Sequence, residues 1–229
     1  MSRAKGLTRL AVALVTCLAT RALAVDITDC GQRVPPGDTG VLQNDIDCTT
    51  SDAIAGIFVG DRATLSLNGH TVIGRAYPYM EAVVGDAARK FTVSGPGVIS
   101  GADVGISGWK RVAVNDVTLT GNTIGIDVPI GHLKLTNVDV NGNATGISGR
   151  TIEAEQVTVN MNSGGDCIIG RNFRGTDVTV TGCYEGVGML GRVSANRLDD
   201  RNNVTTGVSG TWIDEGTGVG PTWGVCPGD

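Results

Sequence analysis

Aromatic side chains are scarce in this sequence: three Phe, three Tyr and three Trp make up only 4% of its 229 residues. The apolar 41% is supplied mainly by Val, Ile, Leu and Ala, so any core must consist of small and branched side chains. Apolar residues do not recur at helical spacing, which argues against a helical fold. No apolar run approaches the roughly 20 residues that a membrane-spanning helix requires. These absences favour an all-β protein without a membrane span.

Motifs for metal and nucleotide chemistry are also missing. The two His and six Cys residues do not have the spacing of zinc ligands, and no segment carries the dense Asp cluster of a calcium loop. Neither a P-loop nor a Gly-x-Ser-x-Gly turn is present. We therefore expect no metal and no cofactor.

Basic residues are outnumbered, with 18 Lys and Arg against 23 Asp and Glu and a net charge of −5. In residues 1–24, three cations precede an apolar run at residues 10–19, and Ala22-Leu23-Ala24 follows it after Arg21. This order is typical of a signal peptide with its cleavage site. We therefore expect a secreted protein, either extracellular or periplasmic. Its acidic balance disfavours nucleic acid as a partner, because phosphate binding depends on an excess of cations.

Five cysteines follow the expected signal peptide, namely Cys30, Cys48, Cys167, Cys183 and Cys226. In an oxidising compartment they predict disulfides, with one cysteine left over. Cys30 and Cys48 flank a Pro-Pro-Gly turn, and a bond between them would stabilise an N-terminal cap by about 3 kcal/mol on the chain-entropy account.

Glycine is abundant, with 35 residues, and much of it is periodic. At a nearly constant interval the same position holds Gly105, Gly125, Gly146, Asp166, Gly186 and Gly207. Segments with alternating apolar residues lie between these positions, centred on Val117, Val138, Val157, Val178 and Leu198. A repeat of about 20 residues predicts a solenoid, whose coils bury their apolar faces only by stacking on one another.

The repeat divides the chain into a cap at residues 25–60, a solenoid at 61–215 and a C-terminal cap or tail at 216–229. The stretch from Arg75 to Lys90 breaks the period and predicts either a looped-out insertion or an irregular coil. Asn122, Asn143 and Asn162 recur near one corner, where their side chains would bond to one another or cap the backbone.

Two segments in the first half carry a family resemblance. Residues 65–74, with the run Asn68-Gly69-His70-Thr71, and residues 93–101 resemble the opening coils of secreted proteins of the pectin-lyase-like superfamily. The likeness extends over roughly residues 26–210. It implies one domain with the fold of a single-stranded right-handed parallel β-helix.

A second likeness concerns catalysis. Gly164-Gly165-Asp166-Cys167, then Cys183, then Gly186-Val187-Gly188 are similar to the galacturonase pattern Gly-Asp-Asp-Cys, Cys, Gly-His-Gly. The resemblance implies a Cys167–Cys183 disulfide and a catalytic carboxylate at Asp166. The other acidic positions of the pattern hold Gly165 and Thr145, and Val187 replaces the histidine.

Glycoside hydrolysis ordinarily requires two carboxyl groups, so Asp166 alone could not perform it. Asp166 as a corner residue without catalytic duty is the interpretation that these replacements favour. A hydrolase would need a second carboxylate, for which Asp127 and Asp103 are the candidates.

Basic residues recur at another corner, after Gly in most coils, at Arg111, His132, Arg150, Arg171 and Arg192. If the coils stack in register, the arginines form a ladder of like charges about 5 Å apart. Neighbouring acids such as Glu153, Asp177 and Asp199 would neutralise it, or a polyanion with repeated carboxylates would bind to it. Both interpretations stay open at this point.

The function that the sequence favours is a monomeric, non-catalytic carbohydrate-interaction module for acidic polysaccharide. One alternative is a polysaccharide-active enzyme, as a pectin-type lyase, an epimerase or a glycoside hydrolase. The other is a structural or adhesive surface protein, since rigid stacked coils also suit spacers.

Overall fold

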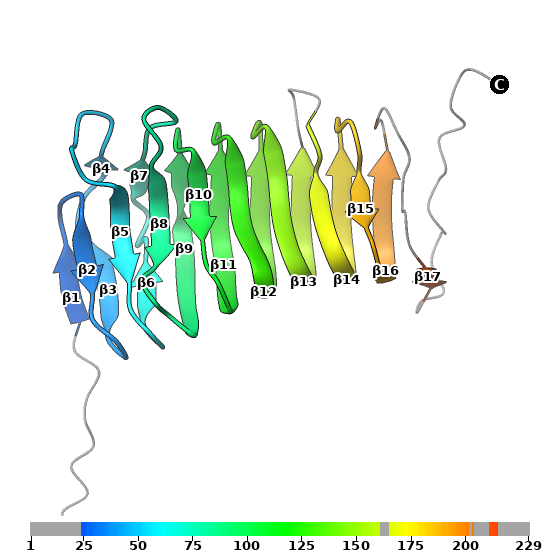
Figure 1. Cartoon of the computed structure of the whole chain (residues 1–229), viewed down its shortest axis with the longest axis horizontal. Helices are drawn as coiled ribbons and strands as arrows, with labels where there is room; N and C mark the ends of the chain where they lie inside the picture. The colour runs from blue at the N-terminus through cyan, green and yellow to red at the C-terminus, as the bar shows by residue number, and fades with distance from the viewer. Residues whose placement is uncertain (1–23, 161–164, 202, 204–210, 215–229) are drawn as a thin grey trace, which may run out of the picture.

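A computed structural model describes residues 24–160, 165–201, 203 and 211–214 of the chain. These residues contain strands and turns and no helix. The strands wind into a solenoid of about eight turns, stacked along the long axis of the molecule (Figure 1). The all-β parallel helix that the sequence predicts is therefore confirmed. Residues 1–23 of the expected signal peptide, Asn162, Gly207, Cys226 and the tail at 216–229 lie outside the described residues.

Each turn of the solenoid crosses three faces, which we call the first, second and third face in chain order. The first face contains β2 (Gln32–Val34), β5 (Ala55–Val59), β8 (Glu81–Gly85), β10 (Val104–Ser107), the beginnings of β12 (Ile124–Asn141), β13 (Thr145–Asn160) and β14 (Ile168–Thr181), and β15 (Val187–Met189).

The second face begins with β1 (Ala24–Ile27), β3 (Thr39–Leu42) and β6 (Thr64–Ser66). It continues through β9 (Lys90–Ser100), β11 (Arg111–Thr120) and the middle of β12, β13 and β14, and it ends with β16 (Arg192–Arg201) and β17 (Thr211–Asp214). The third face contains β4 (Ile46–Asp47), β7 (Thr71–Ile73) and the later parts of the long strands. All strand pairs between these described segments are parallel.

Three edges join the faces, and a different set of side chains lies along each edge. The first edge joins the first face to the second, the second edge joins the second to the third, and the third edge leads into the next coil. The interior between them is filled by aliphatic residues, with Phe91 and Phe173 as the largest fully buried side chains. This agrees with the scarcity of aromatic residues in the sequence.

The periodic glycines have a steric cause. A Cβ atom on Gly105, Gly125 or Gly146 would lie 2.4–2.6 Å from a carbonyl oxygen of the following coil. Strand register places Ile147 beside Ile168, so Cys167, and not Asp166, is the neighbour of Gly146. The sequence spacing placed Asp166 in the glycine column, but Asp166 lies one residue before that column. The step from Gly146 to the next coil is as long as the step from Gly125 to Gly146, and so one residue longer than the spacing assumed.

The third edge carries the expected asparagine ladder. Asn122 and Asn143 are buried, and Asn122 Nδ2 donates to Asn143 Oδ1 at 3.0 Å. The Oδ1 atom of Asn122 accepts from the backbone nitrogen of Ala102, and that of Asn143 from the backbone nitrogen of Asn122. Asn203 continues the ladder by accepting from the backbone nitrogen of Cys183 at 2.8 Å. The sequence interpretation is confirmed for the first two residues and missed Asn203.

The second edge is formed by residues in the left-handed backbone region. Asp116, Asn137, Gln156, Asp177 and Arg197 have φ values between 52° and 58°. Their side chains pair along the edge, since Asn137 Nδ2 donates to Asp116 Oδ1 at 2.7 Å and Arg197 forms an ion pair with Asp177. The residue types vary from coil to coil, so no sequence repeat indicated this corner.

The N-terminal coils are longer than those that follow. Residues 75–90 form an irregular coil and no separate loop, because β8 lies within them and pairs with β5 and β10. Residues 25–60, predicted as a cap, already contain strands that pair with the next coil.

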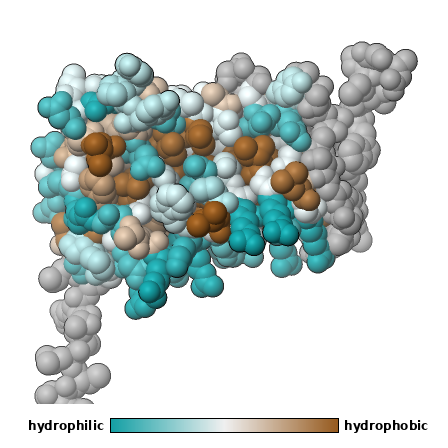
Figure 2. Space-filling model, in the orientation of Figure 1, coloured by the Kyte–Doolittle hydropathy of each residue, from teal (hydrophilic) through white to brown (hydrophobic). Residues whose placement is uncertain are grey.

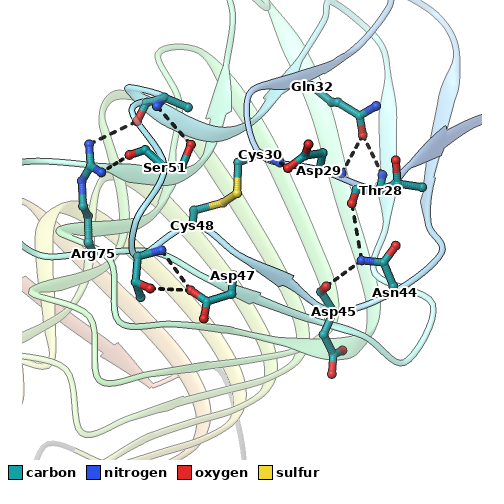
Figure 3. The surroundings of a disulfide bond; sticks show 12 residues. Thr28, Asp29, Cys30, Gln32, Asn44, Asp45, Asp47, Cys48, Ser51 and Arg75 are labelled. Atoms are coloured by element: carbon teal, nitrogen blue, oxygen red, sulfur yellow. Dashed lines mark hydrogen bonds between the residues drawn. A yellow bond between two sulfur atoms is a disulfide. The ribbon is translucent and has the colours of Figure 1, made fainter.

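Two disulfides are present, Cys30–Cys48 and Cys167–Cys183, with Cα–Cα distances of 5.8 and 5.6 Å. Each joins the residues before a first-face strand to those after the third-face strand, so each closes one coil at the third edge. Figure 3 shows the first of them between Gln32 of its own coil and Arg75, which follows β7 in the next coil. There Gln32 Oε1 accepts from the backbone nitrogens of Thr28 and Asp29, while Arg75 donates to the carbonyl of Ser51.

Candidate functional site

Cations gather along the first edge. Figure 2 shows a row of hydrophilic side chains along the lower rim, where Figure 1 places the turns from the first face to the second. The exposed basic residues at these turns are Arg62, Arg89, Lys90, Lys110, Arg111, Arg150, Arg171 and Arg192. The chain is acidic as a whole, so this edge has a charge opposite to that of the protein.

The expected single ladder is wrong in its register. Arg111 lies beside His132, and His132 lies beside Thr151. Arg150 and Arg171 stack on each other one position earlier, since Gly149 pairs with Gly170 and Thr151 with Asn172.

Arg192 returns to the column of His132, because its backbone nitrogen donates to Asn172 Oδ1 at 3.2 Å. The cause is turn length: three residues separate Val128 from His132, and only Arg150 separates the corresponding Gly149 and Thr151. The basic residues therefore form two columns that lie side by side.

Two hollows adjoin the Arg150–Arg171 pair. One, of about 520 Å³, is lined by Pro129, Ser148, Ile169, Glu185 and Leu190 in addition to the two arginines. The other, of about 680 Å³, is lined by both arginines together with Trp109, Arg111, Ile130 and His132. Both arginines therefore face two open depressions on the same edge.

Trp109 gives the second hollow an apolar surface. Its side chain is 57% exposed, and so is that of Ile130 in the next coil. A sugar ring has an apolar C–H side that stacks on an indole ring, and its polar rim reaches neighbouring donors. The hollow therefore combines a stacking surface with guanidinium donors.

His132 is the least solvated basic group in this hollow. Its Nε2 atom is buried, makes no hydrogen bond and lies 3.4 Å from Glu153 Oε1. Glu153, one of the acids that the sequence suggested as neutralising partners, thus lies beside this histidine. Asp177, another of them, lies elsewhere and pairs with Arg197 on the second edge.

Arg111, Arg150 and Arg171 form no ion pair with any carboxylate in the part of the chain that the structure describes. None of the described carboxylates therefore lies within ion-pair distance of these three arginines. The polyanion interpretation of the ladder keeps these residues as its main candidates, although in two columns.

Asp166 is half-buried at the start of the coil that contains β14. The backbone nitrogen of Cys167 donates to the carbonyl of Glu185, and that of Gly146 donates to the carbonyl of Asp166. Asp166 therefore lies between Thr145 and Glu185 in the stack. Its nearest acidic neighbour across the coils is Glu185, at a strand spacing of about 4.8 Å.

The carboxylates considered as partners of Asp166 are farther away. Asp127 pairs with Ser148, which places it two coils before Asp166, or about 10 Å along the axis. Asp103 lies three coils before it, or about 14 Å. Glu185 was not predicted as a neighbour of Asp166, because the one-residue error in the register of Asp166 placed a different residue beside it in the adjacent coil.

A third hollow, of about 650 Å³, lies toward the N-terminal end of the first edge. Its lining includes Asp61, Arg62, Arg89, Lys90, Lys110 and Arg111. Thr64 pairs with Thr92, which is a longer step than in the later coils, so a search for a constant repeat did not find this region. Of these cations, only Arg111 is among the residues that the sequence placed at the basic corner.

Within the described ranges, no group of three or more His, Cys, Asp or Glu side chains could hold a metal ion. The same residues contain no helix long and apolar enough to cross a membrane.

Comparison with known proteins gave no match: no family model, no curated protein and no solved structure is significantly similar to the chain. The parallel solenoid and the two disulfides are thus features of the structure, and the likeness to the pectin-lyase-like superfamily stays a prediction from residues 65–101 and 164–188.

Proposed function

We propose that this protein is a secreted, monomeric, non-catalytic module that binds acidic polysaccharide along the first edge of its solenoid. The observation that carries the proposal is the stacked pair Arg150 and Arg171, which has no carboxylate partner among the described residues and faces two hollows. Guanidinium groups bind carboxylates through paired hydrogen bonds. A polymer with a carboxylate on successive sugars would neutralise the pair.

Trp109 distinguishes a sugar polymer from other polyanions. It lies in the same hollow as Arg111, Arg150 and Arg171, so one sugar ring could stack on the indole while its carboxylate reaches a guanidinium. The proposal includes membership in the pectin-lyase-like superfamily, which the parallel coils and the Cys167–Cys183 bond support. The two disulfides are also consistent with an extracellular location.

The test is binding to immobilised polygalacturonate at several salt concentrations. Because released counterions drive such binding, affinity should fall with salt, and the slope should decrease when cations are removed. The double variant Arg150→Gln/Arg171→Gln should lose about tenfold in affinity at low salt. Equal retention of this variant and the unmodified protein would refute the proposal.

A second candidate is a polysaccharide lyase or hydrolase, and one observation favours it. Asp166 and Glu185 are neighbours in adjacent coils, and Glu185 lines the same hollow as Arg150 and Arg171. Acid–base chemistry on a uronate polymer ordinarily needs two carboxyl groups. Glu185 lies in the hollow of the cations, and Asp166 borders Glu185 in the adjacent coil without lining the hollow.

An assay for new reducing ends and new unsaturated ends on polygalacturonate decides between the two candidates. The non-catalytic proposal expects binding with neither product. Product formation that Asp166→Asn and Glu185→Gln both abolish would replace it with the enzyme. Absence of both binding and products across acidic and neutral polysaccharides would leave the structural or adhesive role.

A further inference from the structure

In the N-terminal part of the first edge, five cations border one hollow. Lys90 lies beside Arg111 in the stack, and the register of Thr64 with Thr92 places Arg62 beside Lys90. One position earlier, Arg89 follows Asp61 and precedes Lys110. We call the five cations of these two columns, Arg62, Arg89, Lys90, Lys110 and Arg111, the cation array.

A single acid, Asp61, lines the same hollow, and one of its oxygens is already bonded to the backbone. Asp61 Oδ1 accepts from the backbone nitrogens of Arg89 and Lys90 at 2.7 and 3.1 Å. Its Oδ2 atom lies 3.7 Å from Nε of Arg62. Asp61 therefore holds the turn in place and leaves most of the array without a counter-ion.

The other four cations have no such partner. Arg89, Lys90, Lys110 and Arg111 form no ion pair through their side chains within the described ranges. All of them are exposed and border one hollow of about 650 Å³. Like charges at strand spacing repel one another in water, and less so in salt, so an anion in this hollow removes a repulsion that the free protein carries.

We propose that the cation array is a binding site for sulfate esters on a polysaccharide, a deepening that rests on the polysaccharide-binding function proposed above. The array is two columns wide and three coils long, so its charges are neighbours across the edge as well as along it. A uronate polymer offers a single carboxylate on each sugar. A heavily sulfated sugar offers several anions around one ring, which matches cations arranged in two dimensions.

The residue types agree with this assignment. Lysine acts as a compact point charge, while arginine supplies a planar fork that bonds to two oxygens of a tetrahedral anion. The array alternates the two types within one hollow. The Arg150–Arg171 column has one guanidinium per coil and contains no lysine; the only described lysine in a hollow beside it is Lys110, which belongs to the array.

The experiment measures the affinity of the full chain for dextran sulfate, polygalacturonate, polyphosphate and uncharged dextran at one salt concentration. The proposal expects tighter binding to dextran sulfate than to polygalacturonate and none to dextran. Arg62, Arg89 and Lys90 border the array's hollow and neither of the hollows beside Arg150. The triple variant Arg62→Gln/Arg89→Gln/Lys90→Gln should therefore lose tenfold or more in affinity for dextran sulfate and less than about threefold for polygalacturonate.

A matched control removes the same charge from outside the first edge: Arg33→Gln/Lys134→Gln/Arg197→Gln. Thermal unfolding checks that both triple variants fold. An equal loss in the two variants, or equal affinity of the unmodified protein for dextran sulfate and polygalacturonate, would overturn the sulfate site and leave polysaccharide binding intact. Tighter binding to polyphosphate than to dextran sulfate would overturn it in favour of phosphate groups, and absence of binding to every polyanion would refute both proposals.

Discussion

Asn143 supports Asn122 inside the third edge of the solenoid: its Oδ1 atom accepts both from the side chain of Asn122 at 3.0 Å and from the backbone nitrogen of Asn122 at 2.9 Å. Its own Nδ2 atom donates to the carbonyl of Leu119 at 3.1 Å. Both side chains are buried, so each coil depends on the next one for the hydrogen bonds of its corner.

Replacing Asn143 with Leu should therefore destabilise the protein by about 2–4 kcal/mol, because buried donors of Asn122 would lose their acceptor. Urea unfolding measures the change. The control is Asn160→Leu, on the exposed third face in the next coil, where a change within about 0.5 kcal/mol is expected. A similar effect of the two substitutions would contradict a structural role for the ladder.

Gly125→Ala tests the steric explanation of the glycine repeat. The added Cβ would lie 2.5 Å from the carbonyl oxygen of Gly146, which forces two coils apart, and we expect a loss of about 2–3 kcal/mol. Gly37→Ala is the comparison, because Gly37 has φ +81° and open space around it, so only backbone strain of about 1 kcal/mol opposes the new side chain. Thermal unfolding of both variants separates crowding from strain.

The spacing of these glycine and asparagine residues explains which parts of the structure could be predicted from the sequence. Where the coils repeat at a nearly constant interval, as from Gly105 to Gly146, spacing alone located the strands and the buried corner. Register depends on turn length, which spacing does not reveal: a single extra position moved Asp166 away from the glycine column, and the longer turn before His132 divided the arginine ladder.

The N-terminal part of the basic edge was harder to predict for a related reason. The coils around Lys90 are longer than those that follow, with Thr64 beside Thr92, so the cations of that region have no fixed interval. Their proximity results from parallel pairing of unequal coils. Glu185 was missed because its importance depends on the corrected position of Asp166.

The disulfides should act as local closures of single coils. The double variant Cys30→Ser/Cys48→Ser opens a loop of 18 residues and should lower the free energy of unfolding by about 3 kcal/mol. Cys167→Ser/Cys183→Ser, with a separation of 16 residues, should have a similar effect. Denaturant unfolding checks both values. Reduction opens both bonds of the unmodified protein, which should therefore lose about the sum of the two values. A variant that loses nothing would show that the coil closes without its bond.

Because the pKa of Asp61 is lowered in the folded protein, we expect the protein to lose stability in acid. The hydrogen bond from the backbone of Arg89 is the largest cause that lowers the pKa of the Asp61 carboxyl. Desolvation opposes it and comes second, and the backbone hydrogen bond from Lys90 and the charges of Arg62 and Arg89 lower the pKa further. Since the folded pKa lies below the unfolded value of about 3.9, the ionised carboxylate stabilises the fold above that pH. This contribution disappears as the pH falls through the folded pKa.

Asp61→Asn should therefore unfold at a lower temperature than the unmodified protein at pH 7, and the difference should shrink toward pH 2–3. Melting temperatures across this range provide the measurement. Asp52→Asn is the control, since Asp52 is exposed and has no hydrogen-bond partner among the described residues. A difference for Asp61→Asn that stays constant with pH would contradict the assignment of the stabilisation to its charge.

Trp109→Ala should weaken binding of the full chain to polygalacturonate by about three- to tenfold, because stacking of an aromatic side chain on an apolar surface contributes about 0.5–1.5 kcal/mol. The salt dependence of binding should stay the same, since no charge is removed, whereas Arg150→Gln/Arg171→Gln should reduce its slope. Tyr77→Ala provides the matched control: Tyr77 is 88% exposed but lies in the irregular coil, away from the first edge. If Trp109→Ala and Tyr77→Ala bind equally well, the indole does not contact the sugar, and the hollow would recognise charge alone.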